Sequence, residues 1–202
     1  MCSIFLVRHG EHPLIGTTLV GRDNASVHLS DQGWQQAREL ATLLGDRDIE
    51  CIQSSPRVRC LETAGPLADR LGLPVHVHDA LDEIDFGDWT GLTFEALEQE
   101  PQWYMWNASR ARARAPGGET IMEACTRAMQ HVEQMCIRYP SKAIAMFTHA
   151  ELIRAVRLHQ RGLSPDAWHS VEVPPVSITE LWMWPSRSPT PAQESIFAAA
   201  AS

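Results

Sequence analysis

Short apolar runs alternate with longer stretches of helical periodicity along this chain, and that alternation leaves few folds open to it. Strands are predicted over residues 3–8, 49–54, 74–78, 142–148 and 176–184. Helices are predicted over residues 30–45, 57–71 and 120–138, and from about residue 151. This order predicts an α/β fold: a three-layer sandwich whose mostly parallel sheet has helices on both faces and an added edge strand.

Local signals mark the ends of two of these helices. Ser30 is a favourable N-cap for the first helix, and Gly45 is a favourable stop. Thr120 and Glu123 have the spacing of a capping box, in which each side chain bonds the other residue's backbone N–H. The periodicity of the helix that follows predicts Met122 on its buried face.

One domain over residues 1–184 accounts for most of the 202 residues. The alternation breaks within about residues 92–118, where an aromatic tract is followed by a Pro-Gly-Gly sequence, and a small inserted lid is predicted there. Trp103 and Trp106 in this segment either line a substrate pocket or pack the lid itself. Residues 185–202, rich in Ser, Pro and Ala, are predicted to be weakly structured.

Composition excludes several classes of protein. The formal net charge of −8 argues against non-specific nucleic-acid binding, and no apolar run approaches the roughly 20 residues of a membrane span. A cytoplasmic protein is therefore expected. Five cysteines without a CxxC pair indicate reduced, buried thiols. His76 and His78 are expected to be surface histidines, because two ligands alone make a poor metal site.

Arginine and histidine residues gather where the predicted strands end. Arg8 and His9 end the first strand, Arg57 and Arg59 follow the second, and His149 follows the fourth. In an open α/β sheet, ligands bind beyond the carboxyl ends of the strands. Phosphoryl transfer needs cations that neutralise the equatorial oxygens and a nucleophile. A small phosphorylated substrate is therefore the expected ligand.

Five sequence blocks follow one another in an order that belongs to a known family. They are Leu6-Val7-Arg8-His9-Gly10-Glu11; Leu29-Ser30 with Gly33 and Gln36-Ala37; Ser54-Ser55-Pro56 with Arg59 and Glu62-Thr63-Ala64; Leu81 with Glu83, Gly87, Trp89 and Gly91; and Pro116-Gly117-Gly118-Glu119 with Thr148-His149. Over residues 3 to about 183 they resemble the histidine phosphatase superfamily, which includes the cofactor-dependent phosphoglycerate mutases. The resemblance implies a parallel sheet between helices with an added edge strand.

The resemblance also implies a catalytic set. His9 resembles the nucleophile, Arg8 and Arg59 resemble the phosphate-binding arginines, and His149 resembles a partner histidine that is protonated as it holds the transferring group. A neutral imidazole can attack phosphorus, and its phosphoramidate product is labile enough for water to cleave. The second ring nitrogen of His9 should therefore donate to a fixed acceptor.

Glu83 resembles the proton donor of the family, which requires a raised pKa. Its rivals in the same loop are Asp82, Asp85 and Asp88. The resemblance adds two substrate contacts, Arg22 from a partly matching Gly-Arg-Asp loop and Ala150 from the position of the small residue after the second histidine. No metal and no cofactor are expected, because arginines do the neutralising.

Two departures from the family pattern bear on the reaction. His12 stands where Thr or Ser is common, and Ile15 stands where mutases commonly carry a phosphate-contacting Asn. The expected function is therefore a phosphomonoesterase that hydrolyses a small phosphorylated metabolite through phosphohistidine at His9. The alternatives are phosphoglycerate mutase-type transfer and a catalytically weak protein that binds phosphorylated ligands.

Arg110, Arg112 and Arg114 are not explained by the family motifs. In an extended segment all three would point the same way and could meet the anionic end of a substrate. Otherwise they belong to a solvated linker. The oligomeric state is left open, with a dimer among the options.

Overall fold

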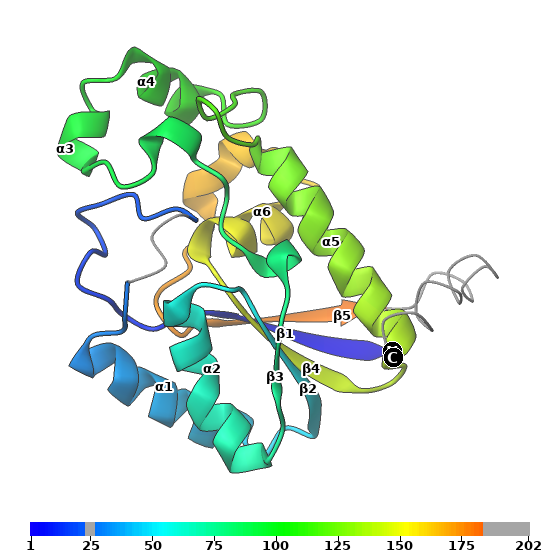
Figure 1. Ribbon diagram of the computed structural model, residues 1–202. Helices are drawn as coiled ribbons and strands as arrows, with labels where there is room; N and C mark the ends of the chain where they lie inside the picture. The colour runs from blue at the N-terminus through cyan, green and yellow to red at the C-terminus, as the bar shows by residue number, and fades with distance from the viewer. Residues whose placement is uncertain (23–26, 184–202) are drawn as a thin grey trace.

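A computed structural model describes residues 1–22 and 27–183 (Figure 1). Its strands are β1 (Cys2–Arg8), β2 (Ile49–Ser54), β3 (Val75–Val77), β4 (Ala143–Thr148) and β5 (Ile178–Met183). Its α-helices are α1 (Asp31–Leu44), α2 (Val58–Leu71), α3 (Phe94–Leu97), α4 (Pro101–Ala108), α5 (Ile121–Arg138) and α6 (Ala150–Gln160). Short 3₁₀ turns cover Asp79–Leu81, Gly87–Trp89 and Pro165–Ser170.

The strands form one sheet in the order β3-β2-β4-β1-β5. All neighbours are parallel except β5, which pairs with β1 in the antiparallel sense at the edge. The predicted α/β sandwich with an added edge strand is confirmed. The parallel strands β1, β2 and β4 end at the same edge, so the residues that follow Arg8, Ser54 and Thr148 meet there.

Side chains of β1 alternate between two apolar cores, one on each face of the sheet. Ile4 and Leu6 join the core beneath α5 and α6, whereas Phe5 and Val7 join the core beneath α1 and α2. A strand with both faces buried shows a continuous apolar run, as this one does. Each fully buried side chain of this size contributes roughly 1.5–3 kcal/mol. Two cores therefore hold the strand end, and with it the site, in place.

The predicted helix ends agree with the structure, but one buried position does not. Ser30 accepts from the backbone N–H of Gly33, and Thr120 forms a reciprocal capping box with Glu123. Met122 was expected to be buried but is 42% exposed. The buried stripe of α5 runs through Ile121, Ala124, Cys125 and Ala128, which leaves Met122 on the rim.

The segment over residues 92–118 contains α3 and α4, which lie beside the loop that follows β1 (Figure 1). Trp106 is fully buried, with its ring edge-to-face on Trp89 at 5.8 Å, and Trp103 meets the same Trp89 ring at 5.2 Å. Of the two expectations for these tryptophans, packing of the segment is therefore the correct one. The predicted tail over residues 185–202 lies outside the described residues.

None of the helices within residues 1–22 and 27–183 has the length and apolar character that crossing a bilayer requires. All five cysteines are free thiols and all are buried. His76 and His78 are exposed, as expected, and in the described part of the chain no cluster of three His, Cys, Asp or Glu side chains could hold a metal ion.

Candidate active site

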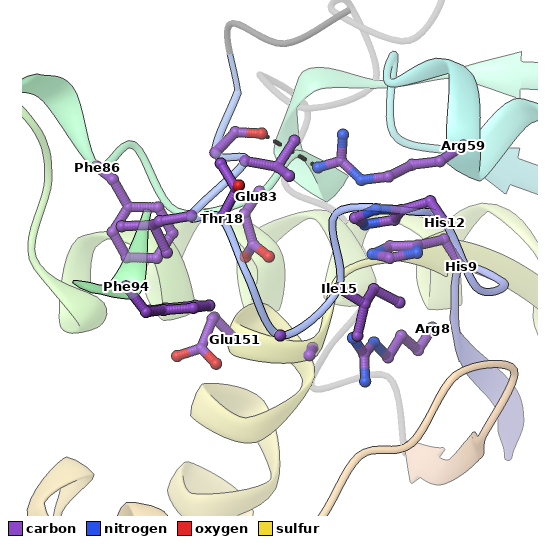
Figure 2. Close-up of a pocket in the computed structure, with 15 residues that line it drawn as sticks. Arg8, His9, His12, Ile15, Thr18, Arg59, Glu83, Phe86, Phe94 and Glu151 are labelled. Carbon is purple, nitrogen blue, oxygen red and sulfur yellow. Dashed lines mark hydrogen bonds between the residues drawn. The ribbon is translucent and has the colours of Figure 1, made fainter. Parts of the chain in front are cut away.

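A cavity of about 120 Å³ opens at the carboxyl ends of the parallel strands. Arg8 and His9 reach it from the end of β1, Arg59 from the first turn of α2, and Glu83 from the loop after β3 (Figure 2). The backbone N–H of His9 donates to Thr148 O at 3.0 Å, which extends the β1–β4 ladder by one residue. The sheet itself therefore fixes where the His9 side chain begins.

His9 is held in the form that a nucleophile needs. Its Nδ1 lies 2.8 Å from Gly10 O, and because a carbonyl can only accept, Nδ1 is the protonated nitrogen. The lone pair is then on Nε2. Burial, with a further contribution from Arg59, lowers the pKa of His9 well below its usual value, so the ring is neutral. The expected donor role of the second ring nitrogen is confirmed.

The guanidinium groups of Arg8 and Arg59 lie beside His9, and each has N–H donors without a hydrogen-bond partner among the described residues. Arg8 Nη1 donates to Val173 O at 2.7 Å, and Arg59 Nη2 donates to Gly21 O at 3.1 Å. Within the part of the chain that the structure describes, Nε of both arginines and Nη1 of Arg59 are buried without a partner. Buried unsatisfied donors are costly, and an anion in the cavity would satisfy them. This pair can therefore hold a phosphoryl group.

His149 lies behind this pair and is not part of the cavity wall. It is fully buried, its ring centroid 5.3 Å from that of His9. Arg59 Nη2 donates to its Nδ1 at 3.1 Å, so Nε2 carries the proton and donates to Ser55 Oγ at 2.8 Å. Burial and the Arg59 charge lower its pKa well below the usual value. In the free protein His149 is therefore neutral and orients Arg59, and its protonation while it holds a transferring group stays a prediction.

Asp82 closes the chain of contacts that begins at His149. Its Oδ1 accepts from Ser55 Oγ at 3.2 Å, and its Oδ2 lies 2.9 Å from Arg57 Nη2. Sequence reasoning preferred Arg59 over Arg57 for the phosphate, and the structure places Arg59 in the cavity and Arg57 on Asp82. Both carboxylate oxygens of Asp82 therefore bind other side chains of the protein. The carboxyl group that reaches the cavity is that of the next residue, Glu83.

Glu83 has the properties of a general acid near neutral pH. It is 8% exposed, and its Oε1 accepts from the backbone N–H of Ile84 at 3.0 Å. Burial, with a contribution from the charge of Glu151, raises the pKa of Glu83 to about 7. A carboxyl group with this pKa can release a proton to a leaving oxygen and take one from water. Its rivals do not reach the cavity: Asp82 and Asp85 are bonded elsewhere, and Asp88 is exposed.

Arg22 was expected to contact substrate, and the structure gives it a different environment. Its Nε donates to Glu83 O at 2.6 Å, and its Nη2 bonds Glu119. Nη1 lies 3.7 Å from Asp85 Oδ2. With its nitrogens engaged in this way, Arg22 holds the backbone of Glu83 from behind. Ala150, the other added contact, does line the cavity, at the first residue of α6.

Comparison with known proteins identifies the family. The model of the histidine phosphatase superfamily (branch 1) matches residues 4–189. The chain belongs to this superfamily. Phosphoserine phosphatase 1 of Hydrogenobacter thermophilus is 30% identical over 160 residues, which are 77% of this chain and 74% of that protein. A solved structure of a mycobacterial glucosyl-3-phosphoglycerate phosphatase in complex with VO3 has a TM-score of 0.79 at 28% identity, with 89% of this chain and 92% of that chain covered.

A bifunctional protein of Mycobacterium tuberculosis is 32% identical over 154 residues. These residues are 75% of this chain but 42% of that relative, so the chain spans less than half of the longer protein. The superfamily motifs named from the sequence are those that surround the cavity: Arg8 and His9, Arg59, and Glu83.

Several residues that line the cavity of this histidine phosphatase superfamily member were not assigned from the sequence, and four of them have aromatic or ionisable side chains. These four are His12, Phe86, Phe94 and Glu151. Glu151 had a usable signal, because it follows the strand-end pair His149-Ala150 directly. Nothing in the sequence pattern marked the two phenylalanines. Phe94 approaches the cavity because residues 92–118 fold back beside the loop after β1, and Phe86 lies in the loop that carries Glu83.

Arg110, Arg112 and Arg114 do not share one direction. Arg110 is 8% exposed, with its guanidinium 4.3 Å from the centroid of the Trp168 ring. Arg112 and Arg114 are exposed, and Arg114 pairs with Glu123. The idea of one extended anion-attracting patch is therefore wrong. A solvated linker describes Arg112 and Arg114, whereas Arg110 is part of the packed interior.

Proposed function

We propose that this protein hydrolyses small phosphate monoesters through a phosphohistidine intermediate at His9. The observation that carries the proposal is the arrangement around His9 Nε2. A neutral imidazole nitrogen faces the cavity, two arginines beside it have unpaired donors, and Glu83 supplies a carboxyl group with a pKa of about 7. Binding alone would need the arginines but not a buried acid.

The reaction has two balanced steps. In the first, His9 Nε2 forms a bond to phosphorus, the bond from phosphorus to the alcohol oxygen breaks, and Glu83 gives its proton to that oxygen. In the second, a water oxygen bonds to phosphorus, the bond to Nε2 breaks, and the Glu83 carboxylate takes the proton of the water. Arg8 and Arg59 neutralise the equatorial oxygens in both steps. The His9 Nδ1–H bond to Gly10 O supports the positive charge that the phosphorylated ring acquires.

Hydrolysis is favoured over mutase-type transfer by what lines the cavity. Ile15 presents an apolar side chain, and Arg8 and Arg59 are the cations among its described lining residues. A mutase must hold two anionic groups of its substrate at once, whereas Arg8 and Arg59 both bind the transferring phosphoryl group and leave no cation for a second one among the described lining residues. A chain that returned phosphoryl groups to a phosphorylated alcohol would need further cations.

We also place this activity in the cytoplasm. All five cysteines are free thiols, and reducing compartments preserve that state. Burial also raises the pKa of the thiols, as at Cys60, where the pKa is raised to about 12. Such thiols are unreactive and need no pairing.

Trapping of the phosphorylated enzyme tests the proposal. Rapid quenching into alkali after mixing with a ³²P-labelled ester should yield a protein-bound label that is stable in alkali and lost in acid. His9→Ala should carry no label and lose up to about a millionfold in turnover. Free phosphate should be released faster than label passes to a second alcohol. A His9→Ala protein with full activity would end this mechanism.

A further inference from the structure

The cavity has two chemically different ends. Figure 2 shows Arg8, His9, His12 and Arg59 on one side and Phe86, Phe94 and Glu151 on the other, with Glu83 above Glu151. The first side holds the transferring phosphoryl group in the proposed function. The second side is therefore where the rest of the substrate lies.

Two aromatic rings form the apolar part of the second side. Phe86 is 2% exposed and meets the ring of Trp106 edge-to-face at 6.1 Å, so its position is fixed from behind. Phe94 begins α3, and its backbone N–H donates to Thr17 O at 3.0 Å. Thr18 and Thr93 form an antiparallel bridge beside it. The loop after β1 and the 92–118 segment are thus joined where they close over the cavity.

Glu151 is the charged part of the second side. Its Oε1 accepts from Arg154 Nη1 at 2.6 Å, and its Oε2 lies 3.5 Å from Arg110 Nη1. Neither arginine lines the cavity, so both hold the carboxylate from behind. Two carboxylate oxygens offer about four acceptor positions, and capacity remains on the cavity side. Burial raises the pKa of Glu151, and the two arginines oppose that effect.

We infer that the second side binds a cationic nitrogen, so that the substrate is the phosphate ester of an amino alcohol. The inference rests on the proposed function. Aromatic faces attract ammonium groups, and a carboxylate beside them adds a direct charge partner. A substrate carboxylate or second phosphate would instead face Glu151, with no cation among the described lining residues of that side to receive it.

The relatives provide a contrast. Their names specify phosphoserine, which carries a carboxylate beside its ammonium group, and glucosyl-3-phosphoglycerate, which carries a carboxylate and no amine. Among the described residues that line the cavity of this chain, the cations are the phosphoryl-binding pair Arg8 and Arg59. The second side thus selects for the amine and against the acid.

Three esters of matched length test the inference. They are 2-aminoethyl, 2-hydroxyethyl and carboxymethyl phosphate, which differ only in the group at the far end. We expect kcat/KM for the aminoethyl ester to exceed that for the hydroxyethyl ester about tenfold, with the carboxymethyl ester lowest. Equal or faster hydrolysis of the carboxymethyl ester overturns the inference. 4-Nitrophenyl phosphate serves as a reference without a charged tail: if it too is not hydrolysed, the proposed function fails instead.

Variants show which residues cause the preference for the aminoethyl ester. Glu151→Gln should reduce the ratio of aminoethyl to hydroxyethyl turnover to near one, because the charge partner is lost while the phosphoryl end is kept. Using a ratio removes any common effect on catalysis. Glu133→Gln, an equal charge change on the exposed face of α5, should keep the wild-type ratio. Phe94→Leu supplies a second variant that leaves the Glu151 ion pairs intact and should also lower the ratio. An unchanged ratio in both Glu151→Gln and Phe94→Leu contradicts the assignment.

Discussion

The imidazole ring of His12 stacks on that of His9, with centroids 5.1 Å apart and ring planes inclined by 32° (Figure 2). His12 is 5% exposed and accepts from the backbone N–H of Leu14 at its Nδ1, so its Nε2 carries the proton. Burial and the charges of Arg59 and Arg8 lower the pKa of His12 to about 4. The ring is therefore a neutral donor that lines the cavity next to the nucleophile.

From this stacking we expect His12 to donate its Nε2–H to the bound phosphoryl group. His12→Phe keeps a planar ring against His9 and removes the donor. A hydrogen bond to a charged group contributes roughly 1.5–3 kcal/mol, so kcat/KM should fall about 10- to 100-fold. His12→Gln, which restores an N–H donor, should recover part of that loss. If His12→Phe matches the wild type on 4-nitrophenyl phosphate, the ring serves packing alone.

The pH dependence of turnover should follow Glu83. Its raised pKa of about 7 means that the acid form, which the first step needs, is lost as the pH rises through 7. His9 has its pKa well below the usual value, so its neutral form is present throughout that range. For alkyl esters, kcat/KM should therefore decline above pH 7 in the free enzyme. A profile that rises between pH 7 and 9 would contradict this assignment.

Replacement of Glu83 separates its acid role from packing. Glu83→Gln should slow phosphoenzyme formation from alkyl esters by roughly 10²–10⁴-fold, because their leaving oxygen needs a proton. The loss should be smaller for 4-nitrophenyl phosphate, whose leaving group is stable as an anion. The alkaline decline in the pH profile should also disappear. Equal losses on both substrates would point to a structural effect of the substitution.

Kinetics of an Arg22 variant should show whether this residue contacts the substrate or positions Glu83. Because its nitrogens bind Glu83 O, Glu119 and Asp85, we expect Arg22→Lys to lower kcat about tenfold and leave KM nearly unchanged. The pKa read from the pH profile should move as well, since the backbone carbonyl of Glu83 loses the Arg22 donor and keeps the bond from Arg127 Nη2 at 2.8 Å. A raised KM with an unchanged kcat would show that Arg22 contacts substrate directly.

The sequence predicted those parts of the site that depend on single strand ends. β2 spans the predicted residues 49–54, and Arg8, His9, Arg59 and Glu83 all reach the cavity. The positions of Arg8, His9 and Arg59 follow from the parallel sheet, which brings the carboxyl ends of β1, β2 and β4 together, whereas Glu83 was assigned from the family resemblance.

What the sequence could not predict depends on contacts between distant segments. His149 is neutral because burial lowers its pKa and because Arg59, on another element, adds its charge and donates to it inside the core. Arg22 turns away from the cavity because Glu119 and Asp85 lie behind Glu83. Arg110 is buried because Trp168, from a turn 58 residues later in the chain, covers it. None of these partners is adjacent in sequence, so no local pattern marks them.

Arg110 gives the last prediction, because its surroundings separate it from Arg112 and Arg114. Its guanidinium packs over Trp168 and Trp106, with ring centroids 4.3 and 6.0 Å away. Nη2 bonds the side chain of Asn107, and Nη1 lies 3.5 Å from Glu151 Oε2. Breaking a buried ion pair typically costs 3–5 kcal/mol, but Glu151 keeps Arg154, so we expect Arg110→Gln to lower the free energy of unfolding by about 1–3 kcal/mol.

Urea unfolding of the single variants checks this expectation. Arg112→Gln, at an exposed position, should change the free energy of unfolding by no more than about 0.5 kcal/mol. Since neither Arg112 nor Arg114 lines the cavity, their replacement should leave KM unchanged for esters with anionic and neutral tails alike, at low and at high salt. A KM that rises at low salt for anionic tails alone would restore the patch of three arginines as a substrate-attracting surface. Equal destabilisation by Arg110→Gln and Arg112→Gln would show that the stacking over Trp168 contributes little.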